Sequence, residues 1–248
     1  MYNVLYNKAR KFATEARHKH GISHLEPLNM EKVYKVSNIS CIKKPLESDI
    51  SGIFMRYNNT KVVVINTSKT LGHQNFTSAH ELYHSEFDEN LEARVCKVGI
   101  FDSKNESEMM ADLFATHFLM PEEGIKFHLS RRIDDFNNID LADVIYLEQL
   151  YGVSHSAMLV RLQQLQIIDE KINEKFLPKI RLNARKYGYD DSLYIPTNDD
   201  VILSSYVEQA QKALDNDLIT FSRYEELLRD ADLLEYEYEE EGVEDYVD

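Results

Sequence analysis

The spacing of apolar residues divides the chain into a helical start, a short stretch of strands and a helical remainder. Residues 2–20 have helical spacing and end at Gly21, which predicts a helix, and a second helix is predicted from about residue 27 to 35. The pattern then becomes short and rich in β-branched residues. Strands are predicted at 39–43, 52–57 and 61–66, with residues 58–60 as the turn of a hairpin.

The rest of the chain carries helical patterns. A helix is predicted at 77–88, capped by Thr77 or Ser78 after a loop at 71–75, and another at 108–120, ending at Pro121. Further helices are predicted at 139–151, 154–166, 198–214 and 222–233, and residues 167–198 resemble a linker. These elements predict an α+β fold, with a small antiparallel sheet packed on the helices at 77–88 and 108–120, followed by an all-helical C-terminal region.

We predict four parts along the chain: a main domain at 1–125, a helix-turn-helix-like subdomain at 126–170, a helical appendage at 171–230 and an acidic tail at 231–248. Of the net charge of −15, ten acidic residues fall at 230–248, which has no Lys or Arg, and this composition is typical of a solvated, disordered segment. Residues 131–166 contain three Arg against five acidic residues, so direct nucleic-acid binding is not expected.

Composition also limits where the protein works. No apolar run approaches the roughly 20 residues that span a bilayer, and no export signal is recognisable, so we expect a cytoplasmic protein without membrane contact. Its two cysteines, Cys41 and Cys96, lack the spacing of a metal site and are expected to be reduced structural thiols. The sequence does not indicate an oligomeric state.

The helix predicted at 77–88 carries the pattern His-Glu-x-x-His at His80, Glu81 and His84. Two His four residues apart lie on one face of a helix, so both imidazoles can bind one Zn²⁺, and Glu81 can reach the water that such a metal activates. A catalytic zinc has three protein ligands and leaves its fourth position to water. A third His ligand of the usual spacing is excluded, because Phe87 and Asn90 stand where that pattern needs Gly and His.

A carboxylate from the next helix is the remaining common solution. Glu108 and Asp112 are four residues apart and share one face, so one can bind zinc while the other accepts a hydrogen bond from a ligating His. Three other carboxylates remain alternatives for the third ligand: Glu86, Asp88 and Glu106. His117 lies on nearly the opposite side of the helix from Glu108, and a packing role is expected for it.

The segments A-H-E-L-Y-H and E-M-M-A-D-L-F-A-T-H-F-L-M-P, both within residues 75–121, resemble the ImmA/IrrE family of metallopeptidases. The resemblance implies a zinc cofactor and three kinds of role, namely metal ligands at His80, His84 and Glu108, a general base at Glu81, and an orienting carboxylate at Asp112. It also implies a site-specific endopeptidase for an intracellular regulator, such as a helix-turn-helix repressor or an antitoxin, in a phage-related or toxin–antitoxin setting. The acidic charge would attract such a basic, DNA-binding partner.

The alternative function is a binding or sensor module whose zinc holds the fold and which acts by protein contact. A water as fourth ligand near Glu81 would favour the enzyme, and a fourth protein side chain would favour the module.

The sequence leaves two questions undecided: the position of the strand at 61–66 in the sheet, and the residue that stabilises the oxyanion. The strand at 61–66 could bind an extended peptide if it lies at the sheet edge beside the metal, or could be buried, as its continuous apolar run also suggests. A donor for the oxyanion could come from Tyr151, His155, His128 or Arg161, and spacing does not rank them.

Overall fold

The computed structural model describes residues 2–47, 49–58, 60–88, 91–98 and 105–230. Contacts between residues divide the chain into two compact units, Met1–Leu203 and Ser204–Asp248. The first unit contains the sheet and the site, and the second contains a pair of helices.

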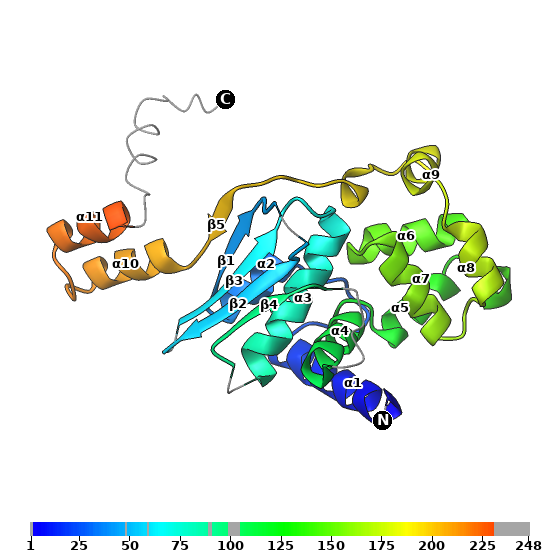
Figure 1. Cartoon of the computed structure of the whole chain (residues 1–248), viewed down its shortest axis with the longest axis horizontal. Coiled ribbons are helices and arrows are strands. Elements are labelled where there is room, and N and C mark those ends of the chain that lie inside the picture. The colour runs from blue at the N-terminus through cyan, green and yellow to red at the C-terminus, as the bar shows by residue number, and fades with distance from the viewer. Residues whose placement is uncertain (1, 48, 59, 89–90, 99–104, 231–248) are drawn as a thin grey trace. The chain divides into compact units, whose positions relative to one another are not determined.

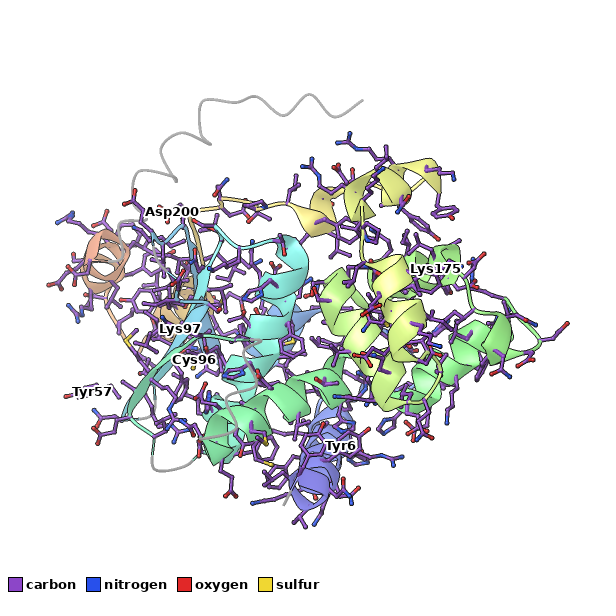
Figure 2. The ribbon with its side chains drawn as sticks, turned by 45° about the vertical axis from the view of Figure 1, so that its right-hand side comes forward. Tyr6, Tyr57, Cys96, Lys97, Lys175 and Asp200 are labelled. Atoms are coloured by element: carbon purple, nitrogen blue, oxygen red, sulfur yellow. The ribbon has the colours of Figure 1, made fainter. Side chains whose placement is uncertain are left out.

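A five-stranded sheet organises the first unit, in the order β4-β2-β3-β1-β5 (Figure 1). Its strands are β1 (Ile39–Lys44), β2 (Gly52–Tyr57), β3 (Thr60–Asn66), β4 (Ala93–Cys96) and β5 (Val201–Leu203). Strands β2 and β3 form the predicted hairpin, with Tyr57 opposite Thr60. The turn end of this hairpin carries the exposed ring of Tyr57 (Figure 2).

The predicted α+β class is confirmed, but the sheet is mixed, whereas the sequence predicted an antiparallel one. Strands β1 and β3 run parallel, with Ile39 opposite Lys61. The reason is that the second strand of the hairpin, and not the first, pairs with β1; hydrophobic patterning does not encode this choice. Strand β3 is therefore an interior strand of the sheet, so the edge-strand interpretation of residues 61–66 is wrong. The alternative, a buried strand, holds for Val63, Ile65 and Asn66, whereas residues 61, 62 and 64 are half-buried.

Four helices pack in two layers on one side of this sheet: α1 (Tyr2–Lys19), α2 (Met30–Val36), α3 (Leu71–Phe87) and α4 (Glu106–Leu119). Helix α3 contacts β2 and β3, α4 packs on α3, and α1 packs on α4. The contact side of α1 consists of Leu5 and three alanines, whose small side chains let the two helices approach closely. Behind them, the fully buried guanidinium of Arg17 donates to the carbonyls of Phe118, Ser23 and Glu26.

Helix α3 begins at Leu71, six to seven residues earlier than predicted, so the loop at 71–75 and the N-cap at Thr77 or Ser78 are wrong. Both hydroxyls instead donate within the helix, from Thr77 to the carbonyl of His73 and from Ser78 to that of Gln74, each at 2.9 Å. Distant residues fix the early start, because the Leu71 amide donates to the Ile195 carbonyl at 3.0 Å.

Between α4 and β5 the first unit is mainly helical. Its helices are α5 (Glu122–Ser130), α6 (Leu141–Tyr151), α7 (His155–Gln164), α8 (Glu170–Phe176) and α9 (Ile180–Lys186). The predicted cap of α7 is confirmed, since the Ser154 side chain accepts from the Ala157 amide. The linker predicted at 167–198 is wrong, because α8 and α9 lie within it and Asp169 caps the first of them.

The second unit is a pair of helices, α10 (Tyr206–Asp215) and α11 (Phe221–Asp230), with a small core of Ala210, Tyr224 and Leu228. Helix α10 begins later than predicted because Val201–Leu203 forms strand β5 against β1. The acidic tail predicted at 231–248 lies outside the described residues. Among the helices that the structure describes, none combines the length and the apolar character needed to cross a bilayer.

Candidate metal centre

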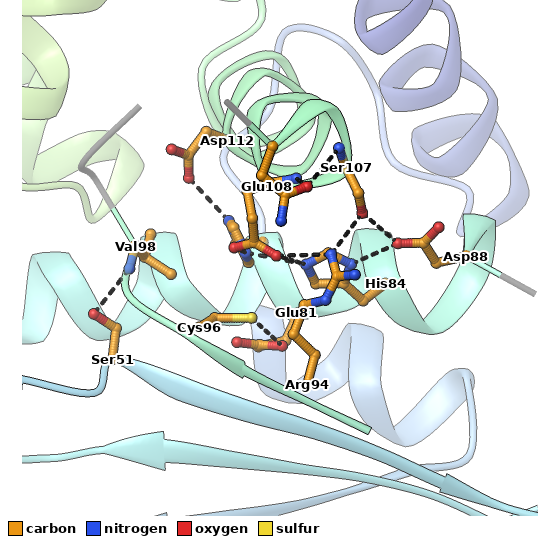
Figure 3. A network of polar contacts seen from close by, with 12 residues as sticks. Ser51, Glu81, His84, Asp88, Arg94, Cys96, Val98, Ser107, Glu108 and Asp112 are labelled. Carbon is orange, nitrogen blue, oxygen red and sulfur yellow. Dashed lines mark hydrogen bonds and ion pairs between the residues drawn. The ribbon is translucent and has the colours of Figure 1, made fainter. Parts of the chain in front are cut away.

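Helix α3 carries the first half of the site. His80 and His84 are one helical turn apart and buried, and their Nε2 atoms lie 3.2 Å from each other. Both Nε2 atoms face Glu108 of α4, and Figure 3 shows His84 in this position. Between them in sequence, Glu81 is also fully buried. The local pattern therefore places two imidazoles and one carboxylate at a single point of the α3–α4 interface.

Helix α4 supplies the second half. Glu108 lies in its first turn, where the Asn105 side chain accepts from the backbone amide of Glu108 and caps the helix. The Glu108 carboxylate lies 3.4 Å from Nε2 of His80 through Oε2 and 3.4 Å from Nε2 of His84 through Oε1. Asp112, one turn later, accepts a hydrogen bond from Nδ1 of His80 at 2.9 Å. Glu108 thus lies on the Nε2 side of the imidazoles and Asp112 on the Nδ1 side.

The other candidate carboxylates lie elsewhere. Asp88 accepts from Nδ1 of His84 at 2.9 Å, on the far side of that ring from Glu108. Glu86 forms an ion pair with Lys19 on α1, and Glu106 is exposed at the start of α4.

The donor set fits zinc. Because the Nδ1 atom of each His donates to a carboxylate, each ring presents an unprotonated Nε2, and two such lone pairs facing each other at 3.2 Å call for a cation between them. Tetrahedral zinc, with bonds of about 2.0–2.2 Å to nitrogen and oxygen, holds its ligand atoms about 3.3–3.6 Å apart. The observed separations of 3.2–3.4 Å agree with this geometry.

Neighbouring groups in the cluster shift the pKa values of Glu108 and His80 in the direction opposite to the effect of burial. Burial by itself would raise the pKa of Glu108, but the adjacent imidazoles of His80 and His84 hold that pKa well below its usual range. Burial would lower the pKa of His80, but its hydrogen bond with Asp112 raises that pKa well above the ordinary value. The pKa of Glu81 is raised by burial. Glu81 is therefore a carboxylate poised toward the basicity that a proton acceptor needs.

Strand β4 adds residues that sequence spacing did not identify. Arg94 donates to Oε1 of Glu108 and to the Ser107 hydroxyl, both at 2.9 Å. Ser107 in turn donates to Asp88 at 2.6 Å. These hydrogen bonds thus connect β4 to α4 and to the end of α3. Of these added residues, only Asp88, four positions after His84, could have been identified from local sequence spacing.

Cys96, at the end of β4, also belongs to the site. Its Sγ lies 3.7 Å from Oε2 of Glu81, and one ligand atom from each of His80, His84, Cys96 and Glu108 lies within 4.8 Å of all the others. Both cysteines are free thiols, and Cys41 is buried in β1. The prediction that Cys96 is only structural overlooked this position, because strand pairing across the sheet brings it there.

Gly52, the first residue of β2, leaves room for the Glu81 carboxylate. A Cβ atom at this position would lie 2.5 Å from Oε1 of Glu81, so a larger residue would displace the acid. Among the described residues, that oxygen has no hydrogen-bond partner although it is buried. Glu81 therefore has one oxygen available to a molecule that enters the site.

A cavity of about 310 Å³ lies between α3, α4 and α7. Its walls include His73, Phe76, Thr116 and Ala157. His73 precedes His80 by two helical turns and so lies on the same face of α3. The cavity therefore extends along the side of α3 that carries His80 and His84.

The four candidates for an oxyanion donor are occupied elsewhere or packed away from the cluster. Arg161 is fully buried and donates to the Met120 carbonyl, and His155 lies between Glu148 and the Phe176 carbonyl. His128 contacts the Leu25 carbonyl, and Tyr151 packs against Gly124. The burial of Arg161 also removes the one cation that the second helix of the helix-turn-helix-like segment could have offered to DNA.

Comparison with known proteins gives one result for this region. The family model described as Peptidase_M78, IrrE N-terminal-like domain, matches residues 35–163, a span that includes every residue of the cluster. A search of curated proteins gives no match to the chain.

Proposed function

The chain belongs to the Peptidase_M78 family, with an IrrE N-terminal-like domain, and we propose that it is a zinc-dependent endopeptidase that cleaves a regulator protein. The matched span covers more than half of the chain and bears out the ImmA/IrrE resemblance of its motifs. One observation carries the proposal: three side chains whose donor atoms have the spacing of tetrahedral zinc lie beside a buried carboxylate that is not needed to hold a metal.

Different side chains would have different roles in peptide hydrolysis. His80, His84 and Glu108 would hold a zinc ion, which when bound lowers the pKa of a water to about 7 and polarises a scissile carbonyl. Glu81 would take the proton of the attacking water and pass it to the leaving amine. Asp112 and Asp88 hold the imidazoles in the tautomer that leaves Nε2 free.

An extended substrate can be bound along β4. This strand is at the sheet edge among the described strands, and its inward side chains, Arg94 and Cys96, face the cluster. The unpaired backbone groups of an edge strand can bind a peptide by strand addition. The peptide-binding role that the sequence suggested for residues 61–66 therefore suits β4 and not β3. The cavity beside α3 would then accept a substrate side chain.

For the substrate we propose a helix-turn-helix repressor or an antitoxin, which the family resemblance implies. Such proteins are basic where they contact phosphate, and the net charge of −15 favours association with them.

A second candidate function, a non-catalytic zinc module, is favoured by Cys96. A fourth protein side chain on the metal would close the position that the attacking water needs. Against this candidate, a structural zinc has no use for the buried Glu81.

The substitution Glu81→Gln tests the peptidase. It removes a base without removing a ligand, so zinc content and fold should be kept while cleavage of a purified, co-encoded helix-turn-helix regulator falls about 100-fold or more. Fragments are measured by mass spectrometry, with Glu106→Gln, an exposed site on α4, as the control. Cleavage at the parent rate by Glu81→Gln would refute the mechanism.

A further inference from the structure

The backbone, and not a flexible side chain alone, holds the sulfur of Cys96 in the cluster. Cys96 is paired with Gly52 across β2 and β4, and its carbonyl accepts from the Ser51 amide at 2.9 Å. Alternation along the strand points Arg94 and Cys96 toward the helices and leaves Val95 exposed. The next residue after Cys96, Lys97, is exposed, and both residues are labelled in Figure 2.

The position of the sulfur within the cluster is specific. His80, His84 and Glu108 account for three corners of a tetrahedron, and Sγ of Cys96 lies on the side where Glu81 stands (Figure 3). An attacking water would have to lie on that same side to give its proton to Glu81. The sulfur and the water therefore compete for one position.

The chemistry of zinc favours the sulfur. A thiolate binds zinc at about 2.3 Å and an imidazole at about 2.0–2.1 Å, which places tetrahedral S and N atoms about 3.5 Å apart. The four ligand atoms lie within 4.8 Å of one another, so the widest pair would have to approach by at most about 1.3 Å. A thiol that coordinates zinc loses its proton, and zinc is among the metals that thiolate ligands select.

A second observation at the same place also indicates a ligand. Oε1 of Glu81 is buried and has no partner in the described part of the chain, although Oε2 of the same carboxylate contacts the sulfur. Such an acid is costly unless something enters the site to use it. The site can therefore accept a molecule that forms a hydrogen bond with Glu81, but the sulfur of Cys96 occupies the position that this molecule would take.

We propose that Cys96 is the fourth zinc ligand of the resting protein and keeps the site latent until the sulfur is displaced. This inference rests on the proposed peptidase function for its regulatory part, whereas the ligation itself does not. Activity requires the sulfur to leave the metal and a water to take its position. The arrangement also explains how one chain carries both a complete general base and a fourth protein ligand.

Cobalt substitution tests the ligation without an activity assay. Co²⁺-loaded parent protein should show a sulfur-to-cobalt charge-transfer band in the near ultraviolet, Cys41→Ala should keep it, and Cys96→Ala should lose it. Cys41 is the matched control because it is an equally buried thiol, on β1. X-ray absorption of the zinc-loaded parent needs no variant and should show one sulfur at about 2.3 Å. A parent protein without zinc–sulfur scattering, or a band that survives in Cys96→Ala, would overturn the proposal.

Ligand binding and cleavage test the latency. Acetohydroxamate, a small zinc chelator, should bind zinc-loaded Cys96→Ala about tenfold or more tightly than the parent, because no sulfur has to be displaced. The same variant should cleave the regulator about tenfold or more faster. Equal hydroxamate affinity and equal cleavage rates would refute latency. If the sulfur band is present but neither parent nor Cys96→Ala cuts any regulator, the ligation stands and the peptidase function fails.

Discussion

The carboxylate of Asp112 lies 2.9 Å from Nδ1 of His80, on the side of the ring opposite to the cluster. Asp88 makes the equivalent contact with His84 at 2.9 Å. The two supports come from different segments, one from α4 and one from the residue that ends α3. The orientation of each imidazole thus depends on the α3–α4 interface as well as on its own helix.

Asp112→Ala should weaken zinc binding about 10- to 100-fold, because the ring of His80 loses the acceptor that fixes its tautomer. Asp112→Asn should have a smaller effect, since its carbonyl oxygen still accepts from Nδ1. Chelator competition measures the affinity, with Asp135→Ala, an exposed cap distant in sequence, as the control. Unchanged affinity in Asp112→Ala would show that the contact does not support the metal.

Glu108→Ala should lose zinc, whereas Glu106→Ala, two residues earlier and exposed, should keep it. The reason is that a carboxylate ligand cannot be replaced by the nearby Arg94, which is a cation. Metal analysis after gel filtration gives the stoichiometry. Equal zinc content in both variants would show that the site is completed without Glu108, with Cys96, the remaining member of the cluster, as the first candidate.

Gly52→Ala should damage catalysis without removing a ligand. Its Cβ would lie 2.5 Å from Oε1 of Glu81 and 2.7 Å from Cγ2 of Thr77, so the acid must move, at a cost of about 1–3 kcal/mol in stability. Cleavage should fall while zinc content stays constant. In the background of Glu81→Gln, the same substitution should reduce cleavage little further, and additive losses would argue against an effect through Glu81.

His117 should make the fold sensitive to acid. Burial, with help from the charge of Arg161, lowers the pKa of His117 to about 3, against about 6.5 in the unfolded chain. Between these values the unfolded chain binds a proton that the folded chain does not, so the stability from neutral His117 is lost as pH falls from about 6.5 to about 3.

His117→Asn isolates this effect, because Asn can still accept from Arg161, as Nδ1 of His117 does at 3.3 Å, but does not titrate. Urea unfolding at pH 7 and pH 5 should show that the parent loses more free energy of unfolding on acidification than the variant does. Parallel losses in the two proteins would contradict the assignment.

Association with a basic regulator should depend on salt and on residues 230–248, which carry ten acidic groups and no Lys or Arg. Raising the ionic strength shortens the Debye length to about 8 Å at 0.15 M, so association slows. Deleting 230–248 should slow association at low salt and flatten the salt dependence. Salt-independent rates that the deletion leaves unchanged would eliminate the electrostatic contribution.

Local spacing was sufficient for part of the site. His80, Glu81 and His84 are separated by distances that a single helix fixes, and Glu108 and Asp112 likewise share one turn of α4. Spacing alone left Glu108 and Asp112 interchangeable. Only the packing of α4 on α3 distinguishes them, by which side of the His80 ring each one reaches.

The rest depended on non-local pairing. Cys96 and Arg94 reach the cluster because β4 pairs with β2 at the sheet edge, and no sequence period encodes that register. The same holds for the parallel pairing of β1 with β3, and for the start of α3 at Leu71, which residue 195 fixes. Local sequence patterns predicted the α+β class and most helices. They did not predict strand pairings or a helix start that depend on contacts between distant segments.

The burial of Arg17 against the end of α4 has a consequence for how the chain is made. Arg17 and its acceptor Phe118 are 101 residues apart, so at about 5–20 residues per second a ribosome needs about 5–20 s between them. During that time the apolar side of α1 has no α4 to cover it, and transiently exposed apolar surface of this kind is prone to aggregation. Helix α1 can dock on α4 only after the residues that complete the candidate metal centre have been synthesised.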